Sequence, residues 1–247
     1  EMIARYMGGD VAWMPLRGSN VNTGENISLT MPFNPMYVNM DQFHGGPIHG
    51  PTRANPSIMV NYGILVKEDG TRFIDEVETY VYVAKAMPKL IPDNKAFIII
   101  DDQVTGISTI DDRIKRYERA NAKYFKANSI SELAKQAGIP EKTLVKVVKD
   151  YNAAVKAKKA TKLNPPNTLK EPRLLTKPPF YAFPFMGGMT ATFGGPKIDK
   201  DAQVLNTEGK PIAGLYAAGN AIGGLLYHDY IGGSQLCAAL IWGRIAG

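Results

Sequence analysis

Hydrophobic residues recur at helical spacing through the middle of the chain. Within residues 141–158 the apolar side chains lie three or four positions apart, and lysines occupy the opposite face. The apolar positions of this segment are Leu144, Val147, Val148, Tyr151 and Val155. The same pattern predicts shorter helices over 111–124 and over 130–137, the second ended by Gly138. We therefore expect three consecutive helices in this part of the chain.

Apolar runs separated by turn residues predict β-strands on either side of these helices. Residues 58–66 and 72–74 flank an Asp69-Gly70 turn, which is typical of a β-hairpin. The run AFIIID at 96–101 predicts a short buried strand. Further strands are predicted in 197–205 and 215–219.

Two Gly- and Pro-rich stretches, 38–56 and 163–185, predict irregular structure, the second as an extended connection. Near the C-terminus, Gly232-Gly233-Ser234 introduces a helix over 235–246 whose side chains are apolar nearly all round. We expect such a helix to be buried, with its first turn facing an internal cavity.

The composition narrows the kinds of site. One Cys and three His among 247 residues exclude a disulfide framework and a multi-cysteine metal cluster built by this chain alone, and we predict no metal site. The net charge of +6 resides largely in 141–162, where lysines line a helix without interleaved stacking aromatics. We expect a solvated face there and no nucleic-acid binding.

The chain also lacks the signals of membrane insertion and targeting. No apolar run approaches the roughly 18 to 20 residues that span a bilayer, and the first residues do not form a signal peptide. We expect a cytoplasmic protein, an upstream targeting sequence aside, without a transmembrane segment. Because the chain opens on Glu1 in the middle of a pattern, we also expect it to be part of a longer protein.

The richest chemical signal is the last stretch, GLYAAGNAIGGLLYHDYIGGSQLCAALIWGRIAG. A strand of small residues, a Gly-rich polar loop and a Gly-Gly-Ser helix start direct backbone N–H groups and the positive end of a helix dipole to one exposed point. Such a point binds anions or electron-rich oxygens. The alternative is a glycine-rich turn that is packed tightly for structural reasons.

This stretch resembles the C-terminal FAD-binding signature of the fumarate reductase/succinate dehydrogenase flavoprotein family. Two more segments resemble family motifs in the same order: Asn22-Thr-Gly-Glu-Asn26 resembles its T-G-D-G loop, and Asp69-Gly-Thr-Arg-Phe-Ile-Asp-Glu76 its G-x-R-F-x-N/D-E segment. The dinucleotide fingerprint G-x-G-x-x-G, which the family carries in its N-terminal half, does not occur here. The chain therefore resembles the C-terminal half of a longer flavoprotein.

The resemblance implies an α+β clamp (capping) domain inserted in an α/β FAD-binding domain, of which only the C-terminal part is present. Residues 1–38 would belong to the FAD-binding domain, 39–189 to the clamp domain that caps the substrate, and 190–247 to the end of the FAD-binding domain. The implied partners are a small-molecule substrate and either the missing N-terminal dinucleotide-binding segment or an electron-transfer partner.

The family pattern also implies FAD as the cofactor and the residues that hold it. The start of the C-terminal helix would meet the isoalloxazine N1/C2=O and stabilise the reduced flavin. Asn220 stands where the family often has a Glu for the ribityl chain, and Asn can still form hydrogen bonds with a hydroxyl. The implied cofactor residues are Thr23, Gly219, Asn220, Gly232, Gly233, Ser234, Gln235 and Leu236.

The substrate side departs from the family. Tyr230 and Tyr80 stand where fumarate reductases have arginines, and Ala191 stands where they have a second histidine; only His44 matches a substrate histidine. Neutral phenols cannot replace two guanidinium groups that hold two carboxylates. We therefore expect that neither fumarate nor succinate is the substrate.

The replacements resemble two subfamilies, the tricarballylate dehydrogenase-like flavoproteins and the 3-ketosteroid Δ1-dehydrogenases. The latter carry a base tyrosine and a ketone-polarising tyrosine where this chain has Tyr80 and Tyr230. A tyrosine needs a lowered pKa or a relay partner to act as a base near neutral pH, and His228 is the nearest candidate in sequence. The predicted catalytic residues are Tyr80, Tyr230 and His228, and the predicted substrate-binding residues are His44, Thr192, Phe193 and Arg72.

The sequence leaves two candidate functions for this chain. The first is part of an FAD-dependent oxidoreductase that transfers hydride between flavin N5 and a CH–CH or C=C bond of an organic acid or ketone. The second is a non-catalytic, clamp-like module that needs a partner segment to bind flavin. Structural roles also stay open for single residues: a hydrogen-bonded structural histidine for His44 and His228, and a half-buried clamp residue for Tyr80.

Overall fold

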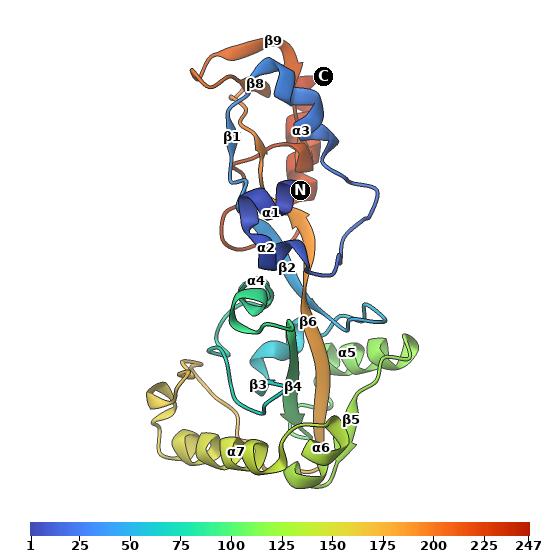
Figure 1. Ribbon diagram of the computed structural model, residues 1–247, viewed down its shortest axis with the longest axis vertical. Coiled ribbons are helices and arrows are strands. Elements are labelled where there is room, and N and C mark those ends of the chain that lie inside the picture. The colour runs from blue at the N-terminus through green and yellow to red at the C-terminus, as the bar shows by residue number, and fades with distance from the viewer. The chain divides into compact units, whose positions relative to one another are not determined.

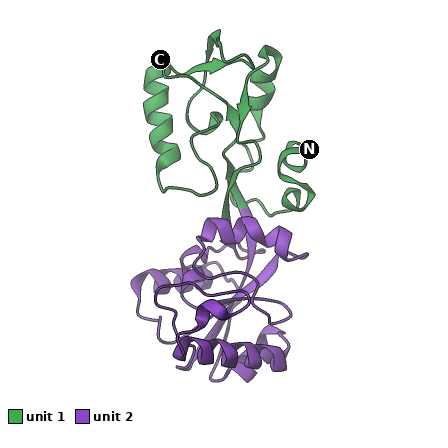
Figure 2. Ribbon diagram, turned by 90° about the vertical axis from the view of Figure 1, so that its left-hand side faces the viewer, with its two compact units in different colours: residues 1–45, 189–247 green, residues 46–188 purple.

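The computed structural model describes all residues, 1–247, and the chain forms two compact units (Figure 2). Unit 1 comprises residues 1–45 and 189–247, and unit 2 comprises residues 46–188. Two strands, β2 (Phe43–Ile48) and β6 (Phe180–Thr192), begin in one unit and end in the other. The limits expected for the clamp domain, 39 and 189, lie close to these boundaries. No helix is both long enough and apolar enough to span a membrane.

Unit 2 is built on an antiparallel sheet in the order β2-β6-β4-β3, with β5 (Phe125–Ala127) also paired to β6. The central pair joins β4 (Lys95–Asp101) to the first half of β6, with Lys95 opposite Met186 and Asp101 opposite Phe180. On its other side β4 pairs with β3 (Ile64–Lys67). The strand predicted at 96–101 is therefore confirmed as a central strand, which explains its unbroken run of buried residues.

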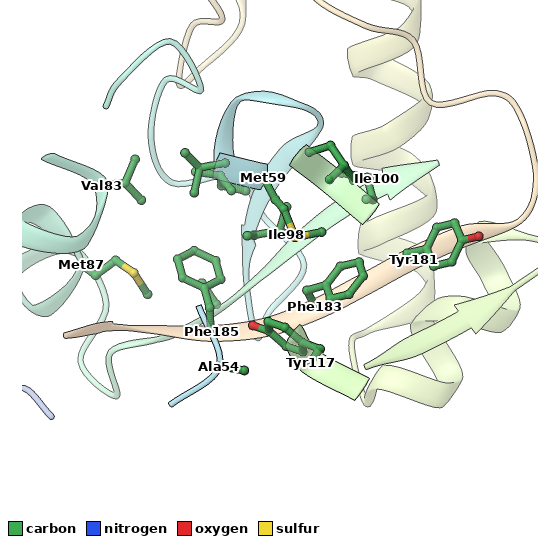
Figure 3. Close-up of a cluster of buried hydrophobic side chains, with 14 of the residues drawn as sticks. Ala54, Met59, Val83, Met87, Ile98, Ile100, Tyr117, Tyr181, Phe183 and Phe185 are labelled. Atoms are coloured by element: carbon green, nitrogen blue, oxygen red, sulfur yellow. The ribbon is translucent and has the colours of Figure 1, made fainter. Parts of the chain in front are cut away.

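Each face of this sheet carries its own hydrophobic core. Alternate residues of β4 and β6 meet η2 (Ser57–Asn61), α4 (Tyr80–Leu90) and α5 (Ser108–Arg119) on one face (Figures 1 and 3). The intervening residues meet α6 (Ile130–Ala137) and α7 (Glu141–Lys156) on the other. The largest fully buried side chains of the first core include Met59, Met87, Ile98, Ile100, Tyr117, Phe183 and Phe185.

The helices predicted in unit 2 are present, and two strand predictions need correction. Residues 58–66 do not form one strand, because η2 occupies the first part and only a single bridge, Val66 to Arg72, closes the expected hairpin. Within the stretch predicted to be irregular, residues 43–48 form β2, which is buried throughout. Pairing with β6 outweighs the low strand propensity of its Gly and Pro residues. Residues from 180 onward likewise belong to β6 rather than to the extended connection, and η3 (Ala160–Lys162) precedes that connection.

Unit 1 contains short elements around two small sheets. One sheet pairs β1 (Tyr37–Val38) with β7 (Gly195–Pro196), and the other pairs β8 (Gln203–Leu205) with β9 (Pro211–Tyr216). A small core joins Val11, Met14, Phe43 and Met189. The helical elements are α1 (Met2–Met7), α2 (Gly9–Ala12), α3 (Glu25–Thr30), η1 (Met31–Phe33), η4 (Gly219–Ala221) and α8 (Ser234–Ala246).

The C-terminal helix α8 forms where it was predicted, but the expectation that it is buried is wrong. Leu236 and Leu240 are each 69% exposed, and Ile241 is 57% exposed. The helix packs mainly on η4, where Ala239 meets Gly219, and only Ala238 is buried. Most apolar side chains of α8 are therefore exposed within residues 1–247, because unit 1 packs only one layer of structure against this helix.

Candidate active site

The site in unit 1 is organised around the end of β6, which two other segments hold in place. On one side, the backbone N–H groups of Arg17 and Gly18 donate to the Met189 carbonyl at 2.7 and 3.1 Å. On the other side, the Phe193 N–H donates to the Gln42 carbonyl at 2.9 Å. Gly18 is required here, because a Cβ atom would lie 1.9 Å from the Thr190 carbonyl oxygen. Residues 190–193 therefore have a fixed path between two partners.

Three predicted site residues meet beside this strand end. The His44 ring stacks on the Tyr230 ring, with centroids 4.2 Å apart and planes 13° apart. Phe193 lies nearly parallel to both, at 6.4 Å from each. Near-parallel stacking at these distances is a favourable aromatic geometry. The structure thus brings His44, Phe193 and Tyr230 together from segments far apart in sequence.

The environment of His44 keeps its imidazole neutral. The pKa of His44 is lowered from 6.5 to about 4, chiefly by burial and secondly by the positive charge of Arg17, while the carboxylate of Asp229 opposes the shift. His44 is 6% exposed. At neutral pH the ring can therefore form hydrogen bonds, but it adds no positive charge to the site.

The loop that carries Tyr230 is fastened to residues 39–42. Asn39 Nδ2 donates to the Leu226 carbonyl at 2.8 Å, and the His228 N–H donates to Gln42 Oε1 at 3.2 Å. His228 itself has φ +63° and an exposed side chain. The left-handed backbone turns the chain between His228 and Tyr230, so the loop geometry places the phenol against His44.

Two cavities in unit 1 lie next to the predicted cofactor residues. One, of about 330 Å³, is lined by the 22–26 loop, by residues 190–192 and by Asn220 and Ala221. The other, of about 420 Å³, is more apolar and shares Asn22, Gly24 and Thr192 with it, and Thr23 also lines it. Asn26 Nδ2 donates to the Ala221 carbonyl at 3.0 Å and so joins α3 to η4. Thr23, Thr192 and Asn220, which were singled out separately, thus surround connected spaces.

The start of α8 offers backbone donors at an open surface. Gly233 caps the helix with φ +85°, and no atom lies within 4 Å of a Cβ built on Gly232 or Gly233. The Ser234 hydroxyl donates to the Ile231 carbonyl at 2.7 Å, which fixes the turn. Because the first amides of a helix have no intrahelical acceptor, those of Gln235 and Leu236 can donate to a ligand that approaches the two glycines.

Gly219 and Thr23 have partners within the protein. A Cβ on Gly219 would lie 3.1 Å from Ala239 Cβ, and its φ is +63°, so this glycine serves the packing of η4 on α8. The Thr23 hydroxyl donates to Glu25 Oε1 at 2.5 Å, and this bond lowers the pKa of Glu25. The loop leads directly into α3, which begins at Glu25.

Comparison with known proteins identifies the family. The "FAD binding domain" family matches residues 35–236. The chain belongs to this family. A probable fumarate reductase of Shewanella frigidimarina (strain NCIMB 400) is 34% identical over 250 residues, covering 100% of this chain and 41% of that relative. The chain thus spans about two fifths of that protein's length.

Two solved structures have the same fold. An open conformation of a flavocytochrome c3 fumarate reductase matches with a TM-score of 0.77 and 29% identity, over 99% of this chain and 42% of that one. A 3-ketosteroid Δ1-dehydrogenase from Sterolibacterium denitrificans, in complex with 1,4-androstadiene-3,17-dione, matches with a TM-score of 0.74 and 25% identity, over 99% and 49%. The resemblance to the fumarate reductase flavoproteins is confirmed.

Within this FAD binding domain family member, Tyr80 and Arg72 belong to unit 2. Tyr80 is the first residue of α4, half-buried, and lines an open cavity of about 670 Å³ with Tyr62, Lys170 and Arg173 among others. Its half-buried state matches the structural alternative stated for it, and its place in a cavity wall is also what a substrate-contacting residue needs.

Arg72 has a structural role, and we no longer assign it to the substrate-binding residues. Its Nε and Nη2 donate to the carboxylate of Glu76, and its Nη1 and Nη2 also donate to the carbonyls of Pro165 and Pro166 at 2.6 and 2.9 Å. Both members of the pair are buried. Arg72 therefore fastens the Pro-rich connection to the sheet rather than facing a ligand.

The motif comparison missed Arg17, Thr190 and Asp229. Arg17 Nη1 donates to Thr190 Oγ1 at 2.8 Å, and both Arg17 and Asp229 act on the pKa of His44. The available signal was an Arg-Gly pair directly upstream of the 22–26 loop. Its importance depends on the pairing with residue 189, which a linear pattern does not reveal.

Proposed function

We propose that this chain is the C-terminal portion of an FAD-dependent oxidoreductase that transfers hydride between flavin N5 and a CH–CH or C=C bond of an organic acid or ketone. The observation that carries the proposal is the stack of His44, Tyr230 and Phe193 next to cavities lined by Thr192 and Asn220. Reactive side chains and predicted cofactor residues thus share one strand end, in a chain that belongs to the FAD binding domain family.

The residues of unit 1 fit a flavin. Gly232 and Gly233 leave the space that a Cβ would fill, and the first amides of α8 are donors suited to an electron-rich carbonyl. Asn220 and Thr23 border the neighbouring cavities and can form hydrogen bonds with hydroxyl groups. When bound, the flavin would supply the hydride acceptor or donor.

In this proposal the chain's own side chains bind the substrate and handle its second proton. Tyr230 would hold that proton on its phenol oxygen, and His44, stacked beneath it and neutral, would accept or donate a hydrogen bond that fixes the reacting group. Phe193, 3% exposed, would exclude water beside them. For a ketone substrate the predicted base is instead Tyr80, from unit 2, and Tyr230 would then polarise the ketone; exposed His228 is the candidate relay to solvent.

The same chemistry argues against a typical fumarate reductase. A C4 dicarboxylate needs two cationic anchors, and Tyr230 is a phenol where the family has a guanidinium. Because His44 is neutral at physiological pH, it does not restore the missing charge. An organic acid with fewer charges or a ketone suits this site better.

Flavin uptake tests the proposal directly. The 247-residue chain and a longer product of the same reading frame are purified, and flavin is measured from absorbance near 450 nm and by release on denaturation. The longer product is expected to be yellow and to exchange hydride with an unsaturated acid or ketone. If the longer product is colourless and takes up no FAD, the enzyme proposal fails.

The second candidate is a non-catalytic module that docks onto a partner segment. The apolar side chains exposed on α8, among them Leu236 and Leu240, favour it, because large exposed apolar patches mark interaction sites. A longer product that associates through α8, holds no flavin and reduces no substrate would support this candidate.

A further inference from the structure

The Pro-rich connection between α7 and β6 is fastened to the rest of unit 2 at two places (Figure 1). At the first, Asn167 Nδ2 donates to Glu76 Oε2 at 2.8 Å, and the Thr168 hydroxyl donates to Asp75 Oδ2 at 2.7 Å. The N–H of Thr168 donates to the same carboxylate. Because Asn167 and Glu76 are both buried, the chain has a fixed position at this point.

The second fastening lies just before β6. The Leu175 N–H donates to Asn152 Oδ1 at 2.8 Å, and Asn152 Nδ2 donates back to the Leu175 carbonyl at 2.8 Å. The N–H groups of Thr176 and Lys177 donate to Oδ2 of the buried Asp101 at 2.7 and 2.8 Å. This end of the connection is therefore fixed as well.

Residues 169–173, which we call the flap, lie between the two fastenings and have few contacts that hold them. The Leu169 N–H donates to Asn167 Oδ1 at 3.3 Å, but no hydrogen bond or ion pair joins residues 170–173 to the rest of the chain. Pro172 has no N–H group to donate. A segment with so few bonds opens locally at little cost in free energy.

One contact holds the flap where it lies. The guanidinium of Arg173 lies over the ring of the half-buried Tyr62, with Cζ 5.5 Å from the ring centroid. A cation in this position is attracted to the electron-rich face of the ring. Because Arg173 is exposed, the attraction is weak enough for the contact to be released and formed again.

The flap also forms part of the wall of the cavity that Tyr80 lines. Four of its five residues border this cavity of about 670 Å³, together with Tyr62, Tyr80 and part of η2. Ser57, at the start of η2, lines the cavity and is only 4% exposed. Movement of the flap therefore changes how far solvent and small molecules reach into this cavity.

We propose that residues 169–173 open and close the cavity beside Tyr80, with the contact between Arg173 and Tyr62 holding the closed position. The flap is a property of unit 2 alone. Its effect on catalysis rests on the proposed function, in which Tyr80 is the base for a ketone substrate.

Amide hydrogen exchange of the 247-residue chain measures local opening. Lys170, Glu171 and Arg173 are expected to exchange close to the unprotected rate. Leu175 and Thr176 should exchange far more slowly, because their N–H groups donate to side chains of the fold. Equal protection of the two sets of amides would contradict a mobile flap.

Trypsin cleavage after Lys170 and after Arg173 tests the contact that holds the flap. Tyr62→Leu removes the ring and keeps an apolar side chain, and both cleavages should become about two- to fivefold faster, the factor for an exposed cation–π contact. Phe125→Leu is the matched control, because it removes the ring under Lys123, 4.9 Å from its centroid, and should leave the flap unchanged. Cleavage after Lys149 and the melting temperature report any general loss of stability.

A thiol in the cavity wall measures entry. In a Cys237→Ser background, which removes the one native thiol, Ser57→Cys is treated with uncharged N-ethylmaleimide. The reaction is expected to be slow with the native flap and about two- to fivefold faster when Tyr62→Leu is added.

Three results would overturn the proposal: unchanged cleavage of the flap in Tyr62→Leu, faster cleavage with unchanged labelling of Ser57→Cys, or an equal acceleration of cleavage after Lys149. The first shows that the contact does not hold the flap, the second that the flap does not control the cavity, and the third that the whole unit has loosened. A longer protein that takes up no FAD defeats the proposed function instead, and the exchange, cleavage and labelling rates still decide the flap.

Discussion

The imidazole of His44 stacks face to face on the phenol of Tyr230, with ring centroids 4.2 Å apart. The sequence predicts His44 at a substrate-histidine position of the fumarate reductase flavoproteins and Tyr230 at the position of one of their arginines, and this contact joins the two. Two stacked neutral rings present an apolar surface with a polar group on each ring that can form hydrogen bonds. A histidine beside a guanidinium would instead form a positively charged site that binds anions. The substitution therefore changes both the charge and the shape of the site.

The buried state of His44 makes folding pH-dependent. Its pKa is about 4 in the folded chain against 6.5 when unperturbed, so between these values the unfolded state binds more protons. Stability is present above pH 6.5 and falls as the pH drops toward 4, and we expect a loss of about 2 kcal/mol from this group. Urea unfolding at pH 7 and pH 4.5 measures it. His44→Gln should lose this slope and the exposed control His228→Gln should keep it; equal slopes in all three proteins would refute the prediction.

The phenol oxygen of Tyr230 can be tested without disturbing the stack. Tyr230→Phe keeps the ring against His44 and removes only the group that would hold the proton. In the flavin-loaded protein we expect kcat to fall by about 10²- to 10⁴-fold, the usual contribution of a general acid or base, with little change in substrate affinity. Stopped-flow measurement of flavin reduction or reoxidation gives the rate. Tyr227→Phe, at a position 65% exposed, is the control, and full turnover by Tyr230→Phe would remove this residue from the mechanism.

A substitution at Gly232 can distinguish an effect on FAD binding from an effect on folding. A methyl group at this position meets no atom within 4 Å, and the backbone there does not have positive φ, so Gly232→Ala should fold normally. If the flavin approaches this backbone, the same methyl group should weaken FAD binding about 10-fold or more, as steric loss of a close hydrogen bond does. Gly209→Ala is the contrasting control: Gly209 also has open space around it, but its φ is +78°. This substitution should lower the stability of the fold without changing FAD affinity. Unchanged FAD affinity in Gly232→Ala would argue against a flavin at the start of α8.

The sequence predicts most helices and the central strand of unit 2 because local periodicity and burial agree there. Residues 130–137 form a helix with the predicted limits, and the apolar run at 96–101 lies in a central strand. Prediction fails where tertiary pairing decides the structure. The segment FHGGPI has the composition of a loop, and it is a strand because β6 lies beside it.

In the candidate site, too, the sequence predicts what local patterns determine and misses what long-range packing determines. Motif spacing singled out His44, Phe193 and Tyr230, which the structure brings into one stack. It assigned Arg72 to the substrate because the motif carries an arginine, and it could not show that Arg72 forms a buried ion pair with Glu76. It overlooked Arg17, whose backbone N–H donates to the carbonyl of Met189 next to the parallel bridge between Leu16 and Met189, a pairing of segments far apart in the chain. Which side chain faces which cavity is a property of long-range packing that spacing alone does not encode.

The Arg72–Glu76 ion pair is buried within unit 2, so we expect breaking it to destabilise this unit. Glu76 is fully buried and also accepts hydrogen bonds from the Leu65 N–H at 3.2 Å and from Asn167 Nδ2 at 2.8 Å. Glu76→Gln removes the negative charge and leaves the guanidinium of Arg72 buried without its counter-charge, which typically costs about 3 to 5 kcal/mol. The exposed pair of Arg116 and Asp112 offers a matched control, because Asp112→Asn should cost less than about 0.5 kcal/mol. Urea unfolding of both variants, followed by far-UV circular dichroism, measures the difference in their free energies of unfolding. Equal costs for the two variants would show that Arg72 is solvated or otherwise compensated, and would reopen its assignment to the substrate.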